Sequence, residues 1–366
     1  NNNTALGMAS LGNDTQGSRS TAVGVAALFS QNFTSATDSY NTAVGYNSGT
    51  AVTTGTNNTL IGGLAGQSIT TGAYNEALGR SSLYTNTTGA YNVAIGSSSL
   101  QNNTTASNNT GVGYKSLYAN TTGDRNVAMG GLALDANTTA DGNTALGYAA
   151  LSGNCGDDNS AVGSYTLFQT TGAKNTAIGQ TAGYGITSGS NNICIGADAG
   201  RTGSPGGNIT SGSNIIVLGD ENITSAQIKV DWTVVSDQRD KTDFTPLDLG
   251  LDFVNALAPV TYKWDMRSKY GDKSADDYDL KAQTPDGTHK EDWLDIGFKA
   301  QEVEALEIAA GYNKSNSTNL VSSHTEDGKQ MGLQYSKFVP ILVKAIQEQN
   351  ALIEALTARI TALEGA

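Results

Sequence analysis

Cysteine, proline, histidine and charge are all scarce in this sequence. Its 366 residues include 2 Cys, 5 Pro and 2 His, and charged side chains make up 15%. Two cysteines are too few for a disulfide scaffold, and Cys155 and Cys194 fall at non-equivalent places along the chain, so we expect two free thiols. The net charge of −13 comes without a basic cluster, which argues against nucleic acid or an anionic membrane as a partner.

Segments for membranes, cofactors and metals are also missing. No apolar run approaches the roughly 20 residues that span a bilayer, so no membrane insertion is expected. Gly111-Val112-Gly113 lacks the βαβ context of a dinucleotide loop, and the paired acids Asp157-Asp158 and Asp220-Glu221 are more typical of solvated turns than of calcium sites. We therefore expect no cofactor and no metal. Because the chain opens on Asn1 without Met or a signal segment, we expect it to be a fragment of a longer protein.

Glycine and charge divide the chain near residue 235. Residues 1–235 hold 36 of the 44 glycines but only 19 charged side chains, whereas residues 236–366 hold 8 glycines and 36 charged side chains. Two chemically unlike parts of this kind indicate a domain boundary between them.

The first part repeats the motif Asn-Thr-Ala-(Val/Ile/Leu)-Gly, mostly every 16 or 17 residues. The residue before each anchor glycine is apolar in all thirteen repeats, and Asn lies four residues before it in eleven of the first twelve, with Ser20 the exception. A short period rich in Asn, Thr and Gly predicts a parallel β-solenoid with one coil per repeat over residues 1–219. The anchors are Gly7, Gly24, Gly45, Gly62, Gly79, Gly96, Gly113, Gly130, Gly147, Gly163, Gly179, Gly196 and Gly219.

Side-chain size limits what such a coil can hold. The interior admits only Ala, Val, Ile and Leu, the corners need Gly or Asn to reach positive φ, and stacked Asn can form an amide ladder. One or two aliphatic residues per coil give a thin core, so we expect a single rod to be marginal and three rods to pack together. The Leu that follows the anchor by four residues in eight repeats is the candidate for the face between rods: Leu11, Leu28, Leu83, Leu100, Leu117, Leu134, Leu151 and Leu167.

The junction between the two parts combines a strand pattern with two reactive side chains. Apolar residues alternate with polar ones from Gln227 to Val235, which predicts a connecting strand over residues 220–235. Ser236 and Lys241 follow, and a serine can cut a peptide bond if a neutral lysine accepts its hydroxyl proton. Free lysine titrates near ~10.4, so burial has to favour the neutral amine. The spacing alone is a weak signal, because an ordinary solvated pair would look the same.

The repeats of residues 1–219 resemble the left-handed β-roll repeats of trimeric autotransporter adhesin heads and of some phage tail fibres. The resemblance implies a mainly β protein that begins with a trimeric, left-handed, parallel β-roll of thirteen coils. It leaves the bound ligand open.

Four motifs follow one another in the second part: Ser236-Asp237-x-Arg239-x-Lys241, Leu251-Asp252-Phe253-Val254-Asn255-Ala256-Leu257-x-Pro259-Val260, Gly297-Phe298-x-Ala300-Gln301-Glu302-Val303, and the run from Tyr335 to Gln349. In this order they resemble the intramolecular chaperone domain of phage tailspikes and endosialidases, which is also the autoprocessing module of some membrane-bound transcription factors. The resemblance covers about residues 236–366. It implies an α+β chaperone autopeptidase domain over residues 236–338.

The same resemblance implies a serine–lysine dyad that cuts the bond just before its own serine. Carried over residue by residue, Ser236 is the nucleophile, Lys241 is the general base and Val235–Ser236 is the scissile bond. The activity would be that of a single-turnover autocatalytic serine endopeptidase that turns over no external substrate.

Several residues near or outside this motif leave alternatives open. Asp240 stands where the family usually has an aliphatic residue, and Thr242-Asp243 replaces a more common pair, so the efficiency of cleavage is open. His289 and His324 invite a triad interpretation, but His289 lies in a polar stretch where solvation is the simpler role.

A seven-residue repeat after Pro340 predicts a C-terminal coiled-coil helix over residues 339–366. Ile at a with Leu at d favours two strands by itself, so the trimer is implied by the family and the rod. An amphipathic helix docked on its own domain is the alternative, and Gln349 in the seam can set the register at a cost in stability. The a positions are Val339, Ile346, Ile353 and Ile360, and the d positions are Leu342, Gln349, Leu356 and Leu363.

These features predict part of a phage tail fibre or tailspike, a host-attachment protein of the virion that is made in the host cytoplasm. Its partners would be two further copies of itself and a host-cell receptor or glycan, and its chaperone would drive trimerisation and folding and then release itself. The alternative is a cell-surface trimeric adhesin with a non-cleaving trimerisation domain, but nothing after Pro340 resembles the membrane anchor of that class. A glycan-degrading tailspike would need paired carboxylates in a groove, and the acids of residues 1–235 are few and scattered.

Overall fold

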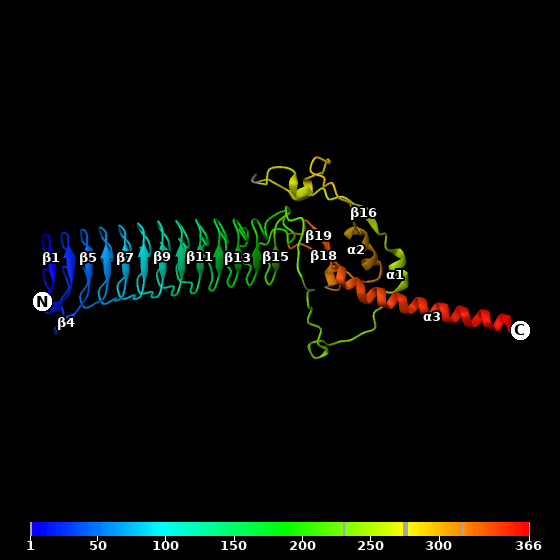
Figure 1. Ribbon diagram of the computed structural model, residues 1–366, viewed down its shortest axis with the longest axis horizontal. Helices are drawn as coiled ribbons and strands as arrows, with labels where there is room; N and C mark the ends of the chain where they lie inside the picture. The colour runs from blue at the N-terminus through cyan, green and yellow to red at the C-terminus, as the bar shows by residue number, and fades with distance from the viewer. Residues whose placement is uncertain (1, 230, 274–276, 317, 319, 366) are drawn as a thin grey trace. The chain divides into compact units, whose positions relative to one another are not determined.

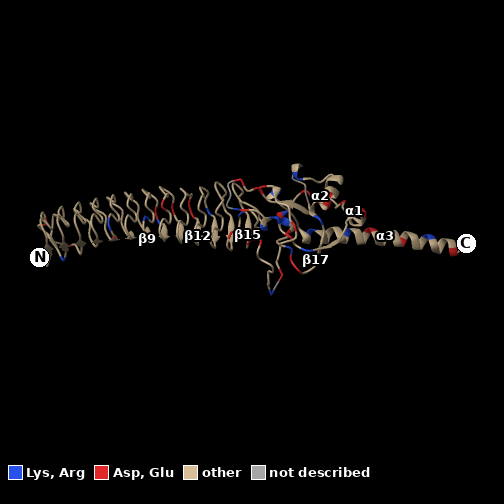
Figure 2. Ribbon diagram, turned by 90° about the horizontal axis from the view of Figure 1, so that it is seen from above, with Lys and Arg blue, Asp and Glu red and all other residues tan. Residues whose placement is uncertain are grey.

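The computed structural model describes residues 2–229, 231–273, 277–316, 318 and 320–365. The chain divides into two compact units, of which unit 1 is Asn1–Asn222 and unit 2 is Ile223–Ala366. Figure 2 shows few charged residues along the ribbon of unit 1 and many in unit 2, as the composition indicated.

Unit 1 is a parallel β-solenoid that contributes one three-residue strand per coil (Figure 1). Thirteen strands form one sheet in which the motif residues of neighbouring coils align, for example Ala22 opposite Ala43. The predicted mainly β, solenoid fold is confirmed. The strands of this sheet are β1 Thr4–Leu6, β3 Thr21–Val23, β5 Thr42–Val44, β6 Thr59–Ile61, β7 Glu76–Leu78, β8 Val93–Ile95, β9 Thr110–Val112, β10 Val127–Met129, β11 Thr144–Leu146, β12 Ser160–Val162, β13 Thr176–Ile178, β14 Ile193–Ile195 and β15 Ile216–Leu218, and in a second small sheet β2 Gly17–Ser18 pairs with β4 Thr37–Asp38.

Glycine at the anchor is a steric requirement of coil stacking. Gly113 has φ +135°, and a Cβ atom there would lie 2.5 Å from the carbonyl oxygen of Gly130 in the next coil. A larger residue would therefore strain the backbone and push the two coils apart. The prediction that glycine forms the corners is confirmed.

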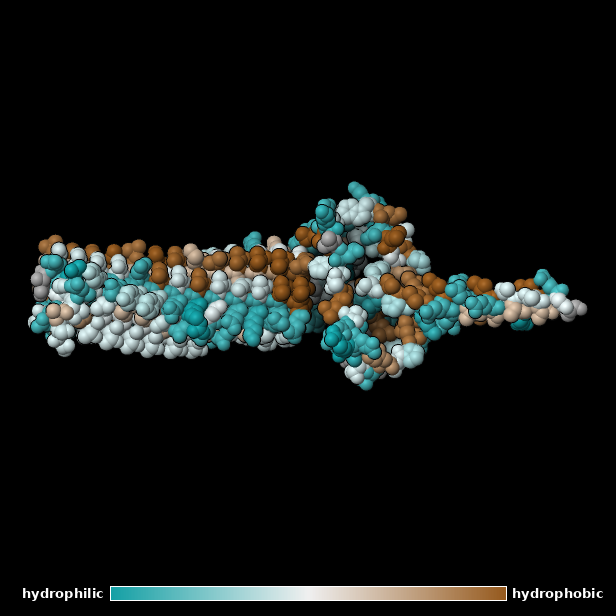
Figure 3. All heavy atoms as spheres, turned by 60° about the horizontal axis from the view of Figure 1, so that its bottom comes forward, coloured by the Kyte–Doolittle hydropathy of each residue, from teal (hydrophilic) through white to brown (hydrophobic). Residues whose placement is uncertain are grey.

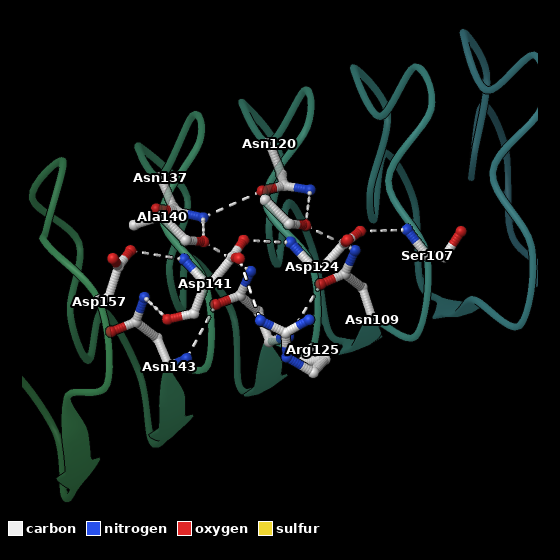
Figure 4. A network of polar contacts seen from close by, with 12 residues as sticks. Ser107, Asn109, Asn120, Asp124, Arg125, Asn137, Ala140, Asp141, Asn143 and Asp157 are labelled. Carbon is white, nitrogen blue, oxygen red and sulfur yellow. Dashed lines mark hydrogen bonds and ion pairs between the residues drawn. The ribbon is translucent and has the colours of Figure 1, made fainter.

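Asparagine four residues before the anchor forms the predicted ladder inside the coils. Asn75 donates its side-chain amide to Asn58 Oδ1 at 3.1 Å and to the carbonyl oxygen of Gly89 at 2.9 Å. Such bonds satisfy buried amides where water has no access. A second ladder, which the sequence analysis missed, joins the Asn side chains seven residues after the anchor at 3.0 Å: Asn86, Asn103, Asn120 and Asn137. Figure 4 shows the bond of this ladder between Asn120 and Asn137.

Gln31 closes the gap that Ser20 leaves in the first ladder. The Gln31 side chain is fully buried, donates from Nε2 to Ser20 Oγ at 3.1 Å, and accepts at Oε1 from Asn41 Nδ2 at 2.8 Å. Gln31 occupies the second-ladder position of its coil, so its extra methylene lets the amide reach from one ladder to the other.

The leucine that follows the anchor by four residues lies inside its own coil, so the prediction that it forms the face between rods is wrong. Leu83, Leu100 and Leu117 are 0% exposed and belong to the same buried cluster as the strand alanines. Their φ values of 49–51° turn the side chain inward. The left-handed conformation costs a leucine roughly 1–2 kcal/mol, and full burial of its side chain, which contributes roughly 1.5–3 kcal/mol, offsets that cost.

Four coils have glycine in place of this leucine, and a β-branched residue fills the same space. Gly183 has φ +61°, and a Cβ atom there would lie 2.8 Å from Leu167 Cδ2 and 3.1 Å from Ile186 Cδ1. The interior of each coil therefore has room for one large aliphatic side chain beyond its strand residue. The fully buried replacements are Val52, Ile69, Ile186 and Ile209.

The apolar residue before each anchor glycine points outward instead. Successive strand residues face opposite sides of a sheet, so Ala94 is 0% exposed while Ile95 is 37% exposed. Figure 3 shows apolar side chains in a line along one face of unit 1. We call this line the outer row, and its members are Leu6, Val23, Val44, Ile61, Leu78, Ile95, Val112, Met129, Leu146, Val162, Ile178, Ile195 and Leu218.

The connecting strand predicted over residues 220–235 is not formed in the described part of the chain, and Val230 lies outside the described residues. Trp232 and Val235 are 76% and 81% exposed. A strand needs a neighbour for its backbone hydrogen bonds, and the described residues from Ile223 to Val235 make no backbone–backbone hydrogen bond to another segment.

Unit 2 combines helices with two-stranded antiparallel sheets, as predicted for an α+β domain. Its core contains Leu249, Phe253, Val303, Val321, Phe338 and Ile341. The elements are α1 Leu251–Ala256, β16 Val260–Tyr262 paired with β17 Asp295–Gly297, α2 Ala300–Ala309, β18 Ser322–His324 paired with β19 Met331–Leu333, α3 Phe338–Glu364, and the 3₁₀ turns η1 Gln238–Asp240, η2 Arg267–Lys269, η3 Leu280–Ala282, η4 Lys314–Asn316 and η5 Tyr335–Lys337.

A buried carboxylate ties α2 to β18. Glu307 is 0% exposed and accepts backbone N–H bonds from Leu320 at 2.8 Å, Val321 at 2.6 Å and Ser322 at 3.0 Å. Burial opposes ionisation of this group, but the hydrogen bonds outweigh burial, so the pKa of Glu307 lies below its ordinary value.

Helix α3 has one face that is buried against the rest of unit 2 over its first turns and another face that is exposed. Phe338, Ile341 and Ala345 are buried, and Glu348 accepts the backbone N–H of Leu251 at the start of α1 at 2.7 Å. The helix is therefore docked on its own domain over its first turns, as the alternative prediction had it, while the heptad positions stay exposed. Their exposed fractions include 60% for Val339, 55% for Ile346, 54% for Ile353, 55% for Leu356 and 53% for Ile360. No helix of the described residues is both long and apolar enough to cross a membrane.

Gly183→Leu is expected to destabilise unit 1 by about 1–3 kcal/mol, because the new side chain overlaps the space that Ile186 holds. Ile186→Ala alone is expected to cost about 2–5 kcal/mol by opening a cavity. The double variant should lose less than the sum, which chemical unfolding followed by circular dichroism measures. Additive losses would show that the two side chains do not share one space.

Glu307→Gln is expected to destabilise unit 2 by about 1.5–3 kcal/mol at neutral pH, since three N–H groups lose their charged acceptor. A carboxylate with a lowered pKa stabilises the fold above its unfolded pKa and loses this contribution as the pH falls through the folded value. The difference between wild type and variant should therefore shrink below about pH 4. Unfolding curves at several pH values measure it, with the exposed Glu302→Gln as the control, and a constant difference would contradict the assignment.

Candidate functional site at the Ser236–Lys241 junction

A single 3₁₀ turn brings Ser236 and Lys241 together. The turn η1 reverses the chain, and the backbone N–H of Lys241 bonds to the carbonyl oxygen of Gln238 at 3.2 Å. Lys241 Nζ consequently lies 2.5 Å from Ser236 Oγ and 3.4 Å from the carbonyl oxygen of Ser236. The two residues singled out in the sequence are thus in direct contact.

Asp237 and Arg239 hold this turn closed. Asp237 Oδ1 accepts the backbone N–H of Arg239 at 2.9 Å, and Oδ2 lies 2.6 Å from Arg239 Nη2. The hydrogen bonds from Arg239 hold the pKa of Asp237 below its ordinary value. The sequence analysis gave neither residue a role, although aspartate just before a helical turn is a recognised N-cap signal that could have identified it.

The predicted dyad and the predicted scissile bond lie open to water. Ser236 and Lys241 are both exposed, and Val235 is 81% exposed. A lysine acts as a general base only as the neutral amine, and removal from water is what favours that form. In the described chain, Lys241 and Ser236 therefore make the contact that a serine–lysine dyad needs, but the two side chains are not buried.

The two histidines make other contacts. His324 Nε2 lies 2.6 Å from Glu304 Oε1, and the His289 ring packs edge-on against Tyr270 with centroids 4.9 Å apart. Among the described residues no hydrogen bond joins either histidine to Ser236, so the geometry gives the triad interpretation no support.

Cys155 and Cys194 are free, as predicted, and both are buried. Burial raises the pKa of Cys155 to about 12 and that of Cys194 to about 11, which keeps both thiols protonated at neutral pH. In the part of the chain that is described, no group of three or more His, Cys, Asp or Glu side chains could hold a metal ion. Asp157 Oδ1 accepts the backbone N–H of Asp141 at 2.9 Å, a bond between neighbouring coils (Figure 4).

A comparison with protein families identifies the segment that begins at this junction. Residues 236–312 match the family model of the chaperone of endosialidase. The matched residues, here called the chaperone region, start at Ser236 and end before β18, so the match is shorter than the predicted range of 236–366. No curated protein and no solved structure matches the chain.

The chaperone region implies an autoproteolytic chaperone activity, and it suggests trimerisation and a place in the virion. Together with the β-solenoid of unit 1, it supports a phage tail fibre or tailspike-like protein with a C-terminal chaperone domain. At this level the prediction from the motifs is confirmed.

Asp237→Ala is expected to slow self-cleavage by about 10-fold to 100-fold, because the turn loses its cap and Lys241 is no longer held on Ser236. Asp237→Asn keeps a capping oxygen and should slow the reaction less. Denaturing gels of a time course measure the rate, with the exposed Asp292→Ala as the control. Cleavage of Asp237→Ala at the wild-type rate would contradict the positioning role.

Proposed function

We propose that the chain is part of a phage tail fibre whose chaperone region assembles three copies and then cuts the Val235–Ser236 bond. The 2.5 Å contact between Lys241 Nζ and Ser236 Oγ carries this proposal. The family match that begins at Ser236 supports the same bond as the site of cleavage.

In the proposed reaction the neutral amine of Lys241 takes the hydroxyl proton of Ser236, and Oγ attacks the carbonyl carbon of Val235. The C–N bond between Val235 and Ser236 breaks, an ester forms between Val235 and Ser236 Oγ, and the Ser236 nitrogen leaves as an amine with the proton from Lys241. Water then hydrolyses the ester to a Val235 carboxylate and a Ser236 hydroxyl. General-base assistance of this kind typically contributes about 10²–10⁴ in rate.

Trimerisation supplies the burial that the single chain lacks. The exposed heptad positions of α3, among them Ile346 and Ile353 at 55% and 54%, support a coiled coil with further copies. Trp232, 76% exposed, adds apolar surface close to the scissile bond that assembly can cover. Lys241 then becomes buried and neutral only when the copies are in place, so the cut follows assembly.

After the cut the fibre no longer has the chaperone with which it assembled, so it cannot reverse its assembly by the same path. The assembled rod is therefore kinetically trapped. Parallel strands that are distant in sequence pair slowly, and a trimerising chaperone would assist this step by holding the three chains together. The released fibre would be a virion protein, made in the host cytoplasm, that attaches to a host-cell receptor or glycan.

Wild-type protein is expected to give fragments of 235 and 131 residues on denaturing gels, since 366 residues are cut after residue 235. Ser236→Ala should stay intact because it has no nucleophile, and Lys241→Met should slow cleavage by about 10²–10⁴ because it has no general base. Ser225→Ala and Lys229→Met are matched controls on the exposed segment before the bond and should cleave normally. Wild-type fragments from Ser236→Ala would remove the assignment of the nucleophile.

A further inference from the structure

The outer row of unit 1 is an apolar line that carries no charge. Leu78, Met129 and Leu218 are 46%, 48% and 51% exposed, and Figure 3 shows the line along one face of the unit. Thirteen coils at roughly 4.8 Å each make it about 60 Å long. A band of that length needs to be only roughly 13 Å wide to bury about 800 Å² per copy, the area of a stable interface.

One coil places opposite charges on the two sides of this row. Glu76 lies two residues before Leu78, Arg80 lies two residues after it, and both charged side chains are exposed. Within the described residues, neither side chain makes an ion pair or a hydrogen bond. The residues that correspond to Glu76 in the other coils are all uncharged: Thr4, Thr21, Thr42, Thr59, Val93, Thr110, Val127, Thr144, Ser160, Thr176, Ile193 and Ile216.

The positions that correspond to Arg80 are almost as free of charge. Apart from Asp220 in the last coil, they hold uncharged residues: Met8, Val25, Tyr46, Gly63, Ser97, Tyr114, Gly131, Tyr148, Ser164, Gln180 and Ala197. A single acid and a single base thus flank the row at one level, and neither has a side-chain partner among the described residues.

We propose that copies of the chain join through their outer rows, parallel and in register, with Glu76 of each copy paired to Arg80 of the next. This rests on the proposed trimerisation and adds to it the surface, the orientation and the residues that set the register. The occupant of the outer row is a further copy of the same chain, because its charge pattern is complementary to itself.

The orientation follows from the two sides of the row. In parallel copies arranged around an axis along the rods, the Glu76 side of each copy faces the Arg80 side of its neighbour, so opposite charges meet at every interface of a closed ring. Glu76 and Arg80 lie in the fifth of thirteen coils, so in a fully overlapping antiparallel pair they would lie opposite the ninth coil of the partner, whose corresponding positions are uncharged. In a parallel pair shifted by one coil, the opposite charges would be offset by about 4.8 Å. Both the antiparallel and the shifted arrangement leave the two ions beside apolar surface without a partner, which is unfavourable.

Charge reversal in the full-length chain tests this proposal. Glu76→Arg and Arg80→Glu each place like charges on both sides of the row, so each alone should give a smaller trimer fraction by native mass spectrometry. When the two variants are co-expressed with distinguishable masses, mixed assemblies should exceed the share expected from random mixing. An ion pair between positions 76 and 80 of the same chain cannot produce this excess of mixed assemblies, because each variant chain carries two like charges at these positions.

Lys174→Glu, an exposed charge reversal away from the row, is the control and should assemble like the wild type. Single variants that assemble normally, or random mixing of the two variants, would overturn the proposed register and leave the trimer intact. A wild-type chain that is monomeric in the same measurement would overturn the trimer and the register together.

Discussion

Stacking of coil on coil at a fixed spacing is the constraint on which unit 1 depends. Each coil hydrogen-bonds its backbone to the next, so its path must repeat that of its neighbour, and a Cβ atom on Gly113 would already lie 2.5 Å from the oxygen of Gly130. Every position of the repeat consequently becomes a line of like residues along the unit. Amides in such a line can bond to one another inside the coil, as Asn75 does to Asn58.

The same constraint leaves little room for a core. Most coils enclose a small strand residue and one larger aliphatic side chain, either a leucine such as Leu117 or, where glycine replaces it, a residue such as Ile186. The coil of β6 encloses two large side chains, Leu60 and Ile69. The remaining apolar residue of each repeat therefore lies outside, in the outer row. A unit that encloses so few apolar residues and exposes a line of others would gain stability if a partner covered that line.

Unit 2 shows the same separation between what one chain completes and what it leaves exposed. Its core and the buried carboxylate of Glu307 are satisfied within the chain, while the heptad face of α3 is exposed. At the junction, a turn held by Asp237 and Arg239 is enough to bring Lys241 onto Ser236. The contact between Lys241 and Ser236 is therefore a local property of six residues, and both side chains are exposed in the single chain.

The sequence by itself determined the periodic features of this protein. The repeat length dictated the solenoid, the steric demand at the anchors dictated glycine, and the motif from Ser236 to Lys241 marked both the start of the chaperone region and two side chains that lie in contact. Only the tertiary structure decided which side of the coil each line of residues faces. A period of 17 residues determines which residues line up from coil to coil, but not whether their side chains point into the coil or out of it. The positive φ of Leu117 turns its side chain inward, although it was expected outside. The connecting segment before Val235 has a strand pattern but forms no strand over its described residues, because backbone hydrogen bonds need a neighbour and alternation in one chain does not provide it.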